Sequence, residues 1–285
     1  MSCNTSAFIV AALTLLTLNT QYLFAQEDAD AAAVAAVSGV PSAVGMGKSG
    51  WRNQWGIGVI ANPKFVGSED YNVSPIPYFD FRYMDQKGTK YFANVPQGLG
   101  GFFYRQRDMK KGSFVNIGAA IAPGFNVRDD SIVGLDEVGV SAEARIMLEA
   151  GGTKWVAAAV IAQDIASGHE GAYVDLSLNR RGQLGKGSGF YAFGPALRIG
   201  DATYNESFFS ISTAASAASG LPAYEAKAGI ERLGLQGLIS LPMGKSKWRL
   251  TSLLRVSSLM DSAADSPIIA DDLQYFFLTA FTRPF

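Results

Sequence analysis

The sequence is poor in the residues that build most reactive centres. Its 285 residues contain one cysteine, Cys3, and one histidine, His169. Cys3 precedes an apolar segment of export-signal length, residues 7–18, so the mature chain is expected to lack cysteine and to form no disulfide or thiolate site. Outside that segment there is no run of about 18 apolar residues, which argues against membrane-spanning helices. The net charge of −1 argues against a nucleic-acid partner.

Three regions are expected along the chain. Residues 1–25 are typical of a signal peptide, because the apolar core is followed by Leu23-Phe24-Ala25, which fits a cleavage site. Residues 26–50 are mostly small and contain no aromatic side chain, which predicts a flexible periplasmic segment. Residues 51–285 should form one compact domain.

Apolar and polar residues alternate over long stretches of this domain. Along residues 173–181, for example, Leu176 and Leu178 share one face, while Asp175 and Ser177 share the other. Such alternation predicts strands with one apolar and one polar face. Residues 155–165 are apolar on both faces and remain ambiguous. The pattern predicts twelve strands, near 54–66, 74–84, 89–95, 98–107, 113–127, 136–149, 153–166, 171–182, 188–200, 227–241, 246–260 and 273–285.

The last predicted strand alternates aromatic residues and ends on Phe281 and Phe285. Every backbone N–H and C=O in lipid needs a partner, so an exported β protein in a bilayer must close on itself, with its last strand against its first. We therefore predict an all-β, closed antiparallel transmembrane barrel, with Phe281 and Phe285 as the signal read by the barrel-assembly machinery.

A soluble β-sandwich is the alternative, since its strands also alternate. Several predicted strands are longer than the five or six residues usual in a sandwich and match the length of a tilted membrane strand. Aromatic residues also gather near predicted strand ends, as in the interfacial girdles of membrane proteins. These are Trp51, Trp55, Tyr83, Tyr91, Trp155, Tyr191, Trp248 and Tyr275.

The connections between predicted strands alternate in length. Short turns such as 85–89, 108–112 and 242–247 should face the periplasm, and the longer, more acidic connections should face outward. An even number of strands requires residues 201–226 to form one external loop, with a short helix near 214–220. Otherwise residues 208–213 would add a thirteenth strand.

Two loop segments resemble motifs of the MipA/OmpV family of outer-membrane proteins. The first is Ser219-Gly220-Leu221-Pro222-Ala223-Tyr224 and the second runs from Asp261 through Asp265, Ser266 and Pro267 to Ile268. Similar matches occur at 55–58, 67–77 and 168–171. The resemblance implies an outer-membrane barrel. It also implies either a scaffold that joins a murein lytic transglycosylase to a penicillin-binding protein, or a porin-like or adhesin role.

Candidate chemistry is sparse. His169, beside Ser167, could serve a hydrolase, but no Gly-x-Ser-x-Gly motif accompanies it, and a solvated loop histidine is the preferred interpretation. The acidic pairs 69–70, 129–130 and 271–272 could bind a divalent cation or the ions that bridge lipopolysaccharide, yet they lack calcium-loop spacing. We expect no catalytic residue, metal or cofactor. We expect the barrel to be surrounded by outer-membrane lipid and lipopolysaccharide.

Charged residues on the polar faces are expected to line the lumen. They could form a narrow anion-preferring pore, or pair with one another and stiffen a closed lumen, which is slightly favoured. Two functions therefore stand: a non-enzymatic scaffold for peptidoglycan enzymes, or a channel for small solutes. The charged residues that are expected to line the lumen are Asp80, Arg82, Glu143, Arg145, Asp175, Arg181, Arg198, Arg232, Arg249 and Arg255.

Overall fold

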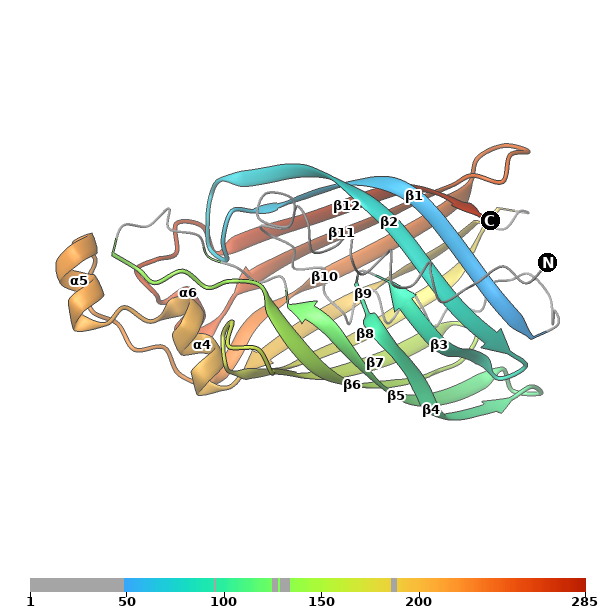
Figure 1. Ribbon diagram of the computed structural model, residues 1–285, viewed down its shortest axis with the longest axis horizontal. Helices are drawn as coiled ribbons and strands as arrows, with labels where there is room; N and C mark the ends of the chain where they lie inside the picture. The colour runs from blue at the N-terminus through green and yellow to red at the C-terminus, as the bar shows by residue number, and fades with distance from the viewer. Residues whose placement is uncertain (1–48, 95, 125–127, 129–133, 186–188) are drawn as a thin grey trace, which may run out of the picture.

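The computed structural model describes residues 49–94, 96–124, 128, 134–185 and 189–285. The predicted signal peptide and most of the segment 26–50 lie outside these residues. The described part is a sheet of twelve antiparallel strands closed into a barrel (Figure 1). The strands are β1 (Gly50–Pro63), β2 (Tyr71–Asp85), β3 (Gly88–Asn94), β4 (Gly98–Asp108), β5 (Ser113–Gly124), β6 (Ser141–Gly151), β7 (Trp155–Asp164), β8 (Ala172–Leu184), β9 (Gly189–Gly200), β10 (Gly229–Pro242), β11 (Arg249–Leu259) and β12 (Leu273–Pro284).

The barrel closes through its first and last strands. Pairing of β1 with β12 runs from Gln54 opposite Pro284 to Ala61 opposite Phe277. Every other strand pairs with its two neighbours in the sequence, so no strand is left at the edge of an open sheet. The predicted closed twelve-stranded barrel is confirmed, and a two-sheet sandwich is excluded.

The two ends of the barrel differ. At the turn end, short connections join β2 to β3, β4 to β5, β6 to β7, β8 to β9 and β10 to β11, and the chain terminus Phe285 lies there too (Figure 1). At the opposite loop end, most connections are longer and carry the helices α4 (Ala202–Phe209), α5 (Thr213–Ser219) and α6 (Asp261–Ala264). The predicted alternation of short and long connections is therefore present.

The connection between β9 and β10 forms one excursion, as the parity of the strands requires. Its residues 208 and 209 belong to α4, and its extended pairing is the isolated bridge between Ile211 and Tyr224, so no thirteenth strand forms there. The predicted short helix is α5. Helix α4 was not predicted; it begins where the Asp201 side chain accepts a hydrogen bond of 2.7 Å from the Tyr204 N–H.

Strand boundaries differ most at β6. The sequence predicted a strand from residue 136, but β6 begins at Ser141, because Val138 instead forms an isolated bridge with Arg128 in the preceding loop. The ambiguous segment 155–165 is β7. Its Val156 and Val160 are buried inside the barrel, while Trp155 and Ile161 are about half exposed outside. The inner face of β7 is therefore apolar because it packs in the interior, and the outer face because it belongs to the apolar outer surface.

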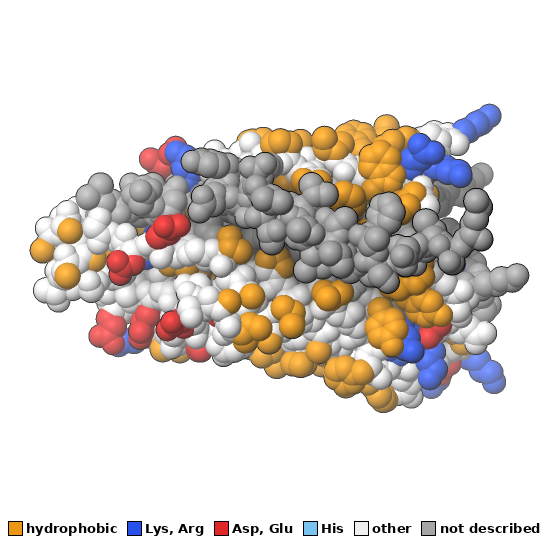
Figure 2. All heavy atoms as spheres, in the orientation of Figure 1, with side chains coloured by type: hydrophobic (Ala, Val, Ile, Leu, Met, Phe, Trp, Pro, Cys, Tyr) orange, Lys and Arg blue, Asp and Glu red, His pale blue; other side chains and the backbone are white. Residues whose placement is uncertain are grey.

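The outer surface of the wall is apolar at mid-height, seen as a band of hydrophobic side chains in Figure 2. Aromatic pairs edge this band. Trp55 lies 5.6 Å from Trp248 at the turn end, and Tyr71 lies 6.5 Å from Tyr275 at the loop end, measured between ring centres. Such girdles are typical of barrels at membrane–water interfaces. None of the helices in the described part is long and apolar enough to cross a bilayer.

Candidate functional site

Charged side chains inside the loop-end half of the barrel form connected ion pairs. Arg198 on β9 donates two hydrogen bonds, of 2.7 and 2.8 Å, to the Asp175 carboxylate on β8. Its guanidinium lies 3.9 Å from the centre of the Tyr173 ring and 3.6 Å from the Glu231 carboxylate, which lies 2.8 Å from Arg232. All five side chains are buried. Removing a charge from water is costly, and these charges are stable inside the barrel because they are paired with charges of opposite sign.

A second pair, on β6, ties this strand to the neighbouring strand β5 and to the β3–β4 turn. Arg145 donates a hydrogen bond of 2.8 Å to Glu143 on the same strand. Its other nitrogens donate to the carbonyl oxygens of Pro96, between β3 and β4, and of Pro123 on β5, at 2.9 and 3.1 Å. The guanidinium therefore holds the β3–β4 turn against the inside of the barrel.

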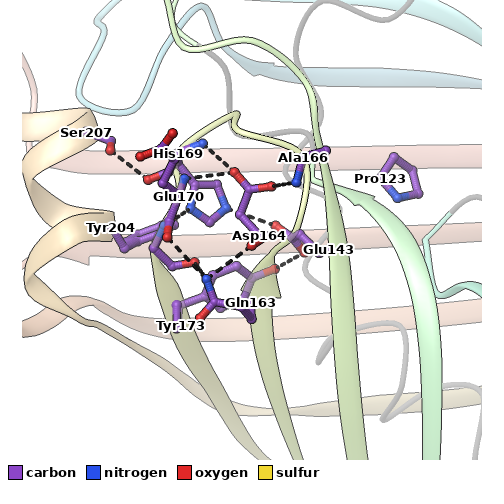
Figure 3. A network of polar contacts seen from close by, with 12 residues as sticks. Pro123, Glu143, Gln163, Asp164, Ala166, His169, Glu170, Tyr173, Tyr204 and Ser207 are labelled. Atoms are coloured by element: carbon purple, nitrogen blue, oxygen red, sulfur yellow. Dashed lines mark hydrogen bonds and ion pairs between the residues drawn. The ribbon is translucent and has the colours of Figure 1, made fainter.

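His169 is buried, with 1% of its surface exposed, so the predicted solvated position is wrong. Its Nε2 lies 3.4 Å from the Glu143 carboxylate, and its Nδ1 accepts a hydrogen bond of 3.2 Å from the Gly171 N–H (Figure 3). The ring packs edge-on against Tyr204 of α4 at 5.0 Å. Asp164 turns the loop inward, because its carboxylate accepts hydrogen bonds from the N–H groups of residues 166, 169 and 170.

These contacts define what His169 can do. A general base needs a free ring nitrogen within reach of a nucleophile. Both ring nitrogens already have partners, Glu143 and a backbone N–H. The nearby Ser207 hydroxyl donates to the His169 carbonyl oxygen, 2.8 Å away, and not to the ring. The arrangement is that of a structural histidine which fastens the β7–β8 loop to α4.

The remaining predicted lumen residues lie in the turn-end half or near mid-height. Arg82 donates to Asp80 at 2.7 Å, and Arg181 donates to the Gly152 carbonyl oxygen at 2.6 Å. Arg249 donates to the Ser240 hydroxyl at 3.1 Å, and Arg255 lies over the Phe276 ring at 5.3 Å. The ten predicted residues thus form separate groups at different heights, and the fold does not bring them to one site.

Two buried carboxylates were missing from the predicted set. Glu149 lies on the polar face of β6, so the alternation pattern could have placed it in the predicted lumen set. Its carboxylate accepts a hydrogen bond of 3.2 Å from Asn116. Glu231 lies beside Arg232, so alternation assigns it to the opposite face. A register shift between Ile230 and Arg232 places both side chains inside, which the sequence pattern does not reveal.

Apolar side chains line much of the interior between the two charged levels. They form two buried clusters on different arcs of the wall, which we call the apolar belt. Clusters of this kind exclude water and oppose the passage of ions. The belt consists of Ile60, Ile76, Leu238, Leu253, Phe276, Leu278 and Ala280 on one arc and of Phe92, Phe102, Ala120, Met147 and Val160 on the other.

The two family-like loop motifs contact each other at the loop end. The Tyr224 hydroxyl donates a hydrogen bond of 2.7 Å to the Ser262 carbonyl oxygen, and the Ser262 hydroxyl donates one of 2.8 Å to the Lys227 carbonyl oxygen. The Ser266 hydroxyl donates to the Phe209 carbonyl oxygen at 2.6 Å. Motifs about 40 residues apart in the sequence therefore hold the β9–β10 and β11–β12 connections together, with Gly220 in the left-handed conformation closing α5.

Beneath these motifs lies a packed apolar core, the loop-end core. It consists of two clusters that share Tyr224 as a partly buried neighbour, and their buried members come from three connections and from β7 and β8. The partly buried residues packed against them are Phe65, Val66, Ala215, Leu221, Tyr224 and Ile269. Gly220, Pro222, Asp261 and Asp265 are exposed on its outer surface. The core covers the loop end of the barrel. Its buried members are Leu135, Val138, Ala162, Tyr173, Tyr204, Phe208, Phe209, Ile211, Ala226, Ala263 and Ile268.

Surface charge is divided between the two ends. In Figure 2, Lys and Arg gather at the turn end, whereas Asp and Glu gather at the loop end. We call the exposed cations of the turn end the basic rim. Asp108 shapes one of its turns by accepting hydrogen bonds of 2.9 and 3.0 Å from the N–H groups of Lys110 and Lys111. The rim comprises Arg52, Lys87, Lys110, Lys111, Lys154, Arg180, Lys245, Lys247 and Arg283.

The acidic loop pairs form no compact ligand set in the described part of the chain. Asp70 makes an exposed ion pair of 2.6 Å with Lys64, and Asp272 is exposed. The pair 129–130 lies outside the described residues. Across the residues that the structure describes, no group of three or more His, Cys, Asp or Glu side chains is placed to hold a metal ion.

Comparison with known proteins agrees with the motif loops. No curated protein matches the chain. One family model, described as MltA-interacting protein MipA, matches residues 55–285, which is nearly the whole barrel. Because this match covers well over half of the sequence, the chain belongs to the MltA-interacting protein MipA family.

Proposed function

We propose that this protein is a non-enzymatic scaffold of the outer membrane which binds peptidoglycan-remodelling enzymes at its turn end. The closed barrel and the family together indicate an outer-membrane protein. We also propose that the protein is exported through a cleaved signal peptide, with the turn end in the periplasm and the acidic loop end facing lipopolysaccharide.

The observation that carries the proposal is the contrast between the interior and the basic rim. The interior is filled by paired charges, the apolar belt and the loop-end core, which offer a solute little polar passage. The rim instead presents exposed cations on short, well-formed turns. Rigid turns carrying an excess of positive charge are suited to steering and holding an oppositely charged protein surface.

The family description supports a lytic transglycosylase as one partner, because the family is named for interaction with MltA. A penicillin-binding protein as a second partner goes beyond that name and is part of the proposal. A barrel that held both enzymes would keep cleavage and synthesis of murein strands close together without performing chemistry itself.

Capture from detergent extracts tests the proposal. Affinity-purified wild-type protein should retain a lytic transglycosylase, and glutamate at Lys110, Lys111, Lys245 and Lys247 together should weaken its capture. Each exposed charge contributes about 1 kcal/mol or less, so several must be reversed at once. A matched control reverses the same number of acidic loop-end residues, Glu69, Asp136, Glu225 and Asp272. Equal loss in both variants, or no partner in the wild type, would count against the scaffold.

The second candidate is a narrow channel for small solutes, favoured by the buried arginines of the lumen. Planar-bilayer recording of the pure protein distinguishes the two. A scaffold with this interior should give no ion-conducting steps. Stepwise conductance whose anion selectivity changes with Arg249→Gln or Arg255→Gln would support the channel instead.

A further inference from the structure

Two arginines near the turn end lie on the outer, lipid-facing surface of the wall. Arg180 on β8 follows the exposed leucines Leu176 and Leu178 on the same face of its strand. Arg283 on β12 likewise follows the exposed Phe281. Both arginine side chains are exposed. The outer face of these strands therefore changes from apolar to cationic just before the turn end, where blue side chains meet the orange band in Figure 2.

Each arginine lies opposite a tryptophan of the neighbouring strand. Arg180 is paired with Trp155 of β7, and Arg283 is paired with Trp55 of β1. Residues that are opposite each other in an antiparallel pair project from the same face of the sheet, so each tryptophan shares the outer surface with its arginine. Tryptophan is enriched where the hydrocarbon of a bilayer meets its headgroups. The two guanidinium groups are therefore placed at the height of the headgroups.

Neither guanidinium has a partner within the protein. Among the described residues, the side chains of Arg180 and Arg283 make no hydrogen bond or ion pair. The carboxylates on the described turns of this end are already engaged. Asp85 pairs with Arg105 at 2.7 Å, and Asp108 accepts hydrogen bonds from N–H groups of its own turn. An anion that pairs with these two arginines must therefore come from their surroundings.

Aromatic residues flank each arginine on both sides. β12, which carries Arg283, lies between β1 and β11, and the rings of Trp55 and Trp248 approach to 5.6 Å from the two sides. Such a frame supports the apolar stem of an arginine while its charged head reaches the polar layer. The flanking residues are Trp55 and Trp248 at Arg283, and Trp155 and Phe193 at Arg180.

We propose that Arg180 and Arg283 each bind the phosphate of an anionic phospholipid in the leaflet at the turn end. A guanidinium matches two phosphate oxygens, and the acyl chains of the lipid lie along the apolar residues Leu178 and Phe281 on the same faces. The positive potential of the basic rim favours lipids of net negative charge, such as phosphatidylglycerol, over zwitterionic phosphatidylcholine. This site is independent of the scaffold proposed above, because it uses arginines of the wall and not lysines of the turns.

Competition between two lipids for the wall tests the proposal. The protein without its predicted signal peptide is reconstituted at low salt in brominated phosphatidylcholine with rising fractions of unbrominated phosphatidylglycerol. Bromine quenches tryptophan fluorescence, so its recovery measures the relative binding constant of phosphatidylglycerol. The fluorescence reports the leaflet at the turn end, because all four tryptophans lie there. These are Trp51, Trp55, Trp155 and Trp248.

The test variant combines Arg180→Gln with Arg283→Gln. Its matched control combines Lys64→Gln with Lys227→Gln, which removes the same charge from exposed side chains of the loop end. The wild type and the control should prefer phosphatidylglycerol by about fivefold, as expected for one basic residue near an anionic lipid, and the test variant should show almost no preference. Each single arginine variant should lose part of the preference, which gives a reading where the double variant fails to fold, as judged by lost heat-modifiability.

Three results would overturn the proposal. The first is a wild type that does not distinguish the two lipids. The second is a preference that survives in the arginine variants, or that falls equally in the loop-end control. The third is loss of the preference when inorganic phosphate replaces chloride at the same ionic strength, because the arginines would then bind free phosphate and not a lipid headgroup.

Discussion

The buried pair of Asp175 and Arg198 offers a quantitative test of how dry the barrel interior is. Arg198 is 2% exposed and makes two charge-assisted hydrogen bonds to Asp175, with the Tyr173 ring beneath it. The change Arg198→Met keeps the length of the side chain and removes its charge. Asp175 would then be left buried without its main partner.

The size of the effect depends on the environment of the pair. Removing one partner of a buried ion pair costs about 3–5 kcal/mol, because the other charge remains uncompensated. In a water-filled pore the same change would cost about 1 kcal/mol or less, as at an exposed pair. Adding Asp175→Leu should recover most of the loss, and the coupling between the two changes should reach about 2–3 kcal/mol.

Equilibrium unfolding of detergent-solubilised protein by guanidinium, followed by tryptophan fluorescence, measures these differences. Arg180→Met is the matched control, since Arg180 lies on β8, the strand paired with β9, with its side chain exposed outside. It should change the free energy of unfolding by about 0.5 kcal/mol or less. A small loss for Arg198→Met, similar to this control, would mean that the interior is hydrated and that the lumen is not closed.

Three further predictions concern the wall, the loop end and the membrane. Leu176→Arg, on the lipid side, should cost about 2–4 kcal/mol in the same assay, whereas Leu176→Phe should cost less than about 1.5 kcal/mol; equal losses would contradict the assigned faces. Tyr224→Phe removes the bond to Ser262 and should cost about 1 kcal/mol and speed proteolysis in residues 201–228. Burial, and then the charge of Asp265, raise the pKa of Tyr224, so its contribution should be complete below its ordinary pKa of about 10 and be lost as the pH rises through the folded value. Unheated and boiled samples should migrate differently on a gel, and recovery in the soluble periplasmic fraction would contradict the membrane barrel.

Much of the fold could be predicted because a strand that faces lipid on one side must alternate apolar and polar residues. Where one face meets hydrocarbon and the other meets a polar interior, as at Leu176 and Asp175, each side chain reports its own face. The same logic predicted twelve strands and the single excursion between β9 and β10. It was ambiguous at β7, where the inner face also packs into the apolar belt.

The features that the sequence did not reveal depend on contacts between distant segments. His169 resembles a solvated loop residue until Asp164 turns its loop inward and α4 covers it. Glu231 enters the barrel only because the register shifts beside it. The alternation of apolar and polar residues indicates on which face of the wall a residue lies, but not which residue it contacts.

The most direct test of the central claim is a binding titration between a purified lytic transglycosylase and this protein in lipid nanodiscs at increasing salt. We expect saturable binding that weakens as salt rises and is reduced when the basic-rim residues Lys110, Lys111, Lys245 and Lys247 are replaced by glutamate. Binding that is absent, or that is unchanged by both salt and these replacements, would contradict it.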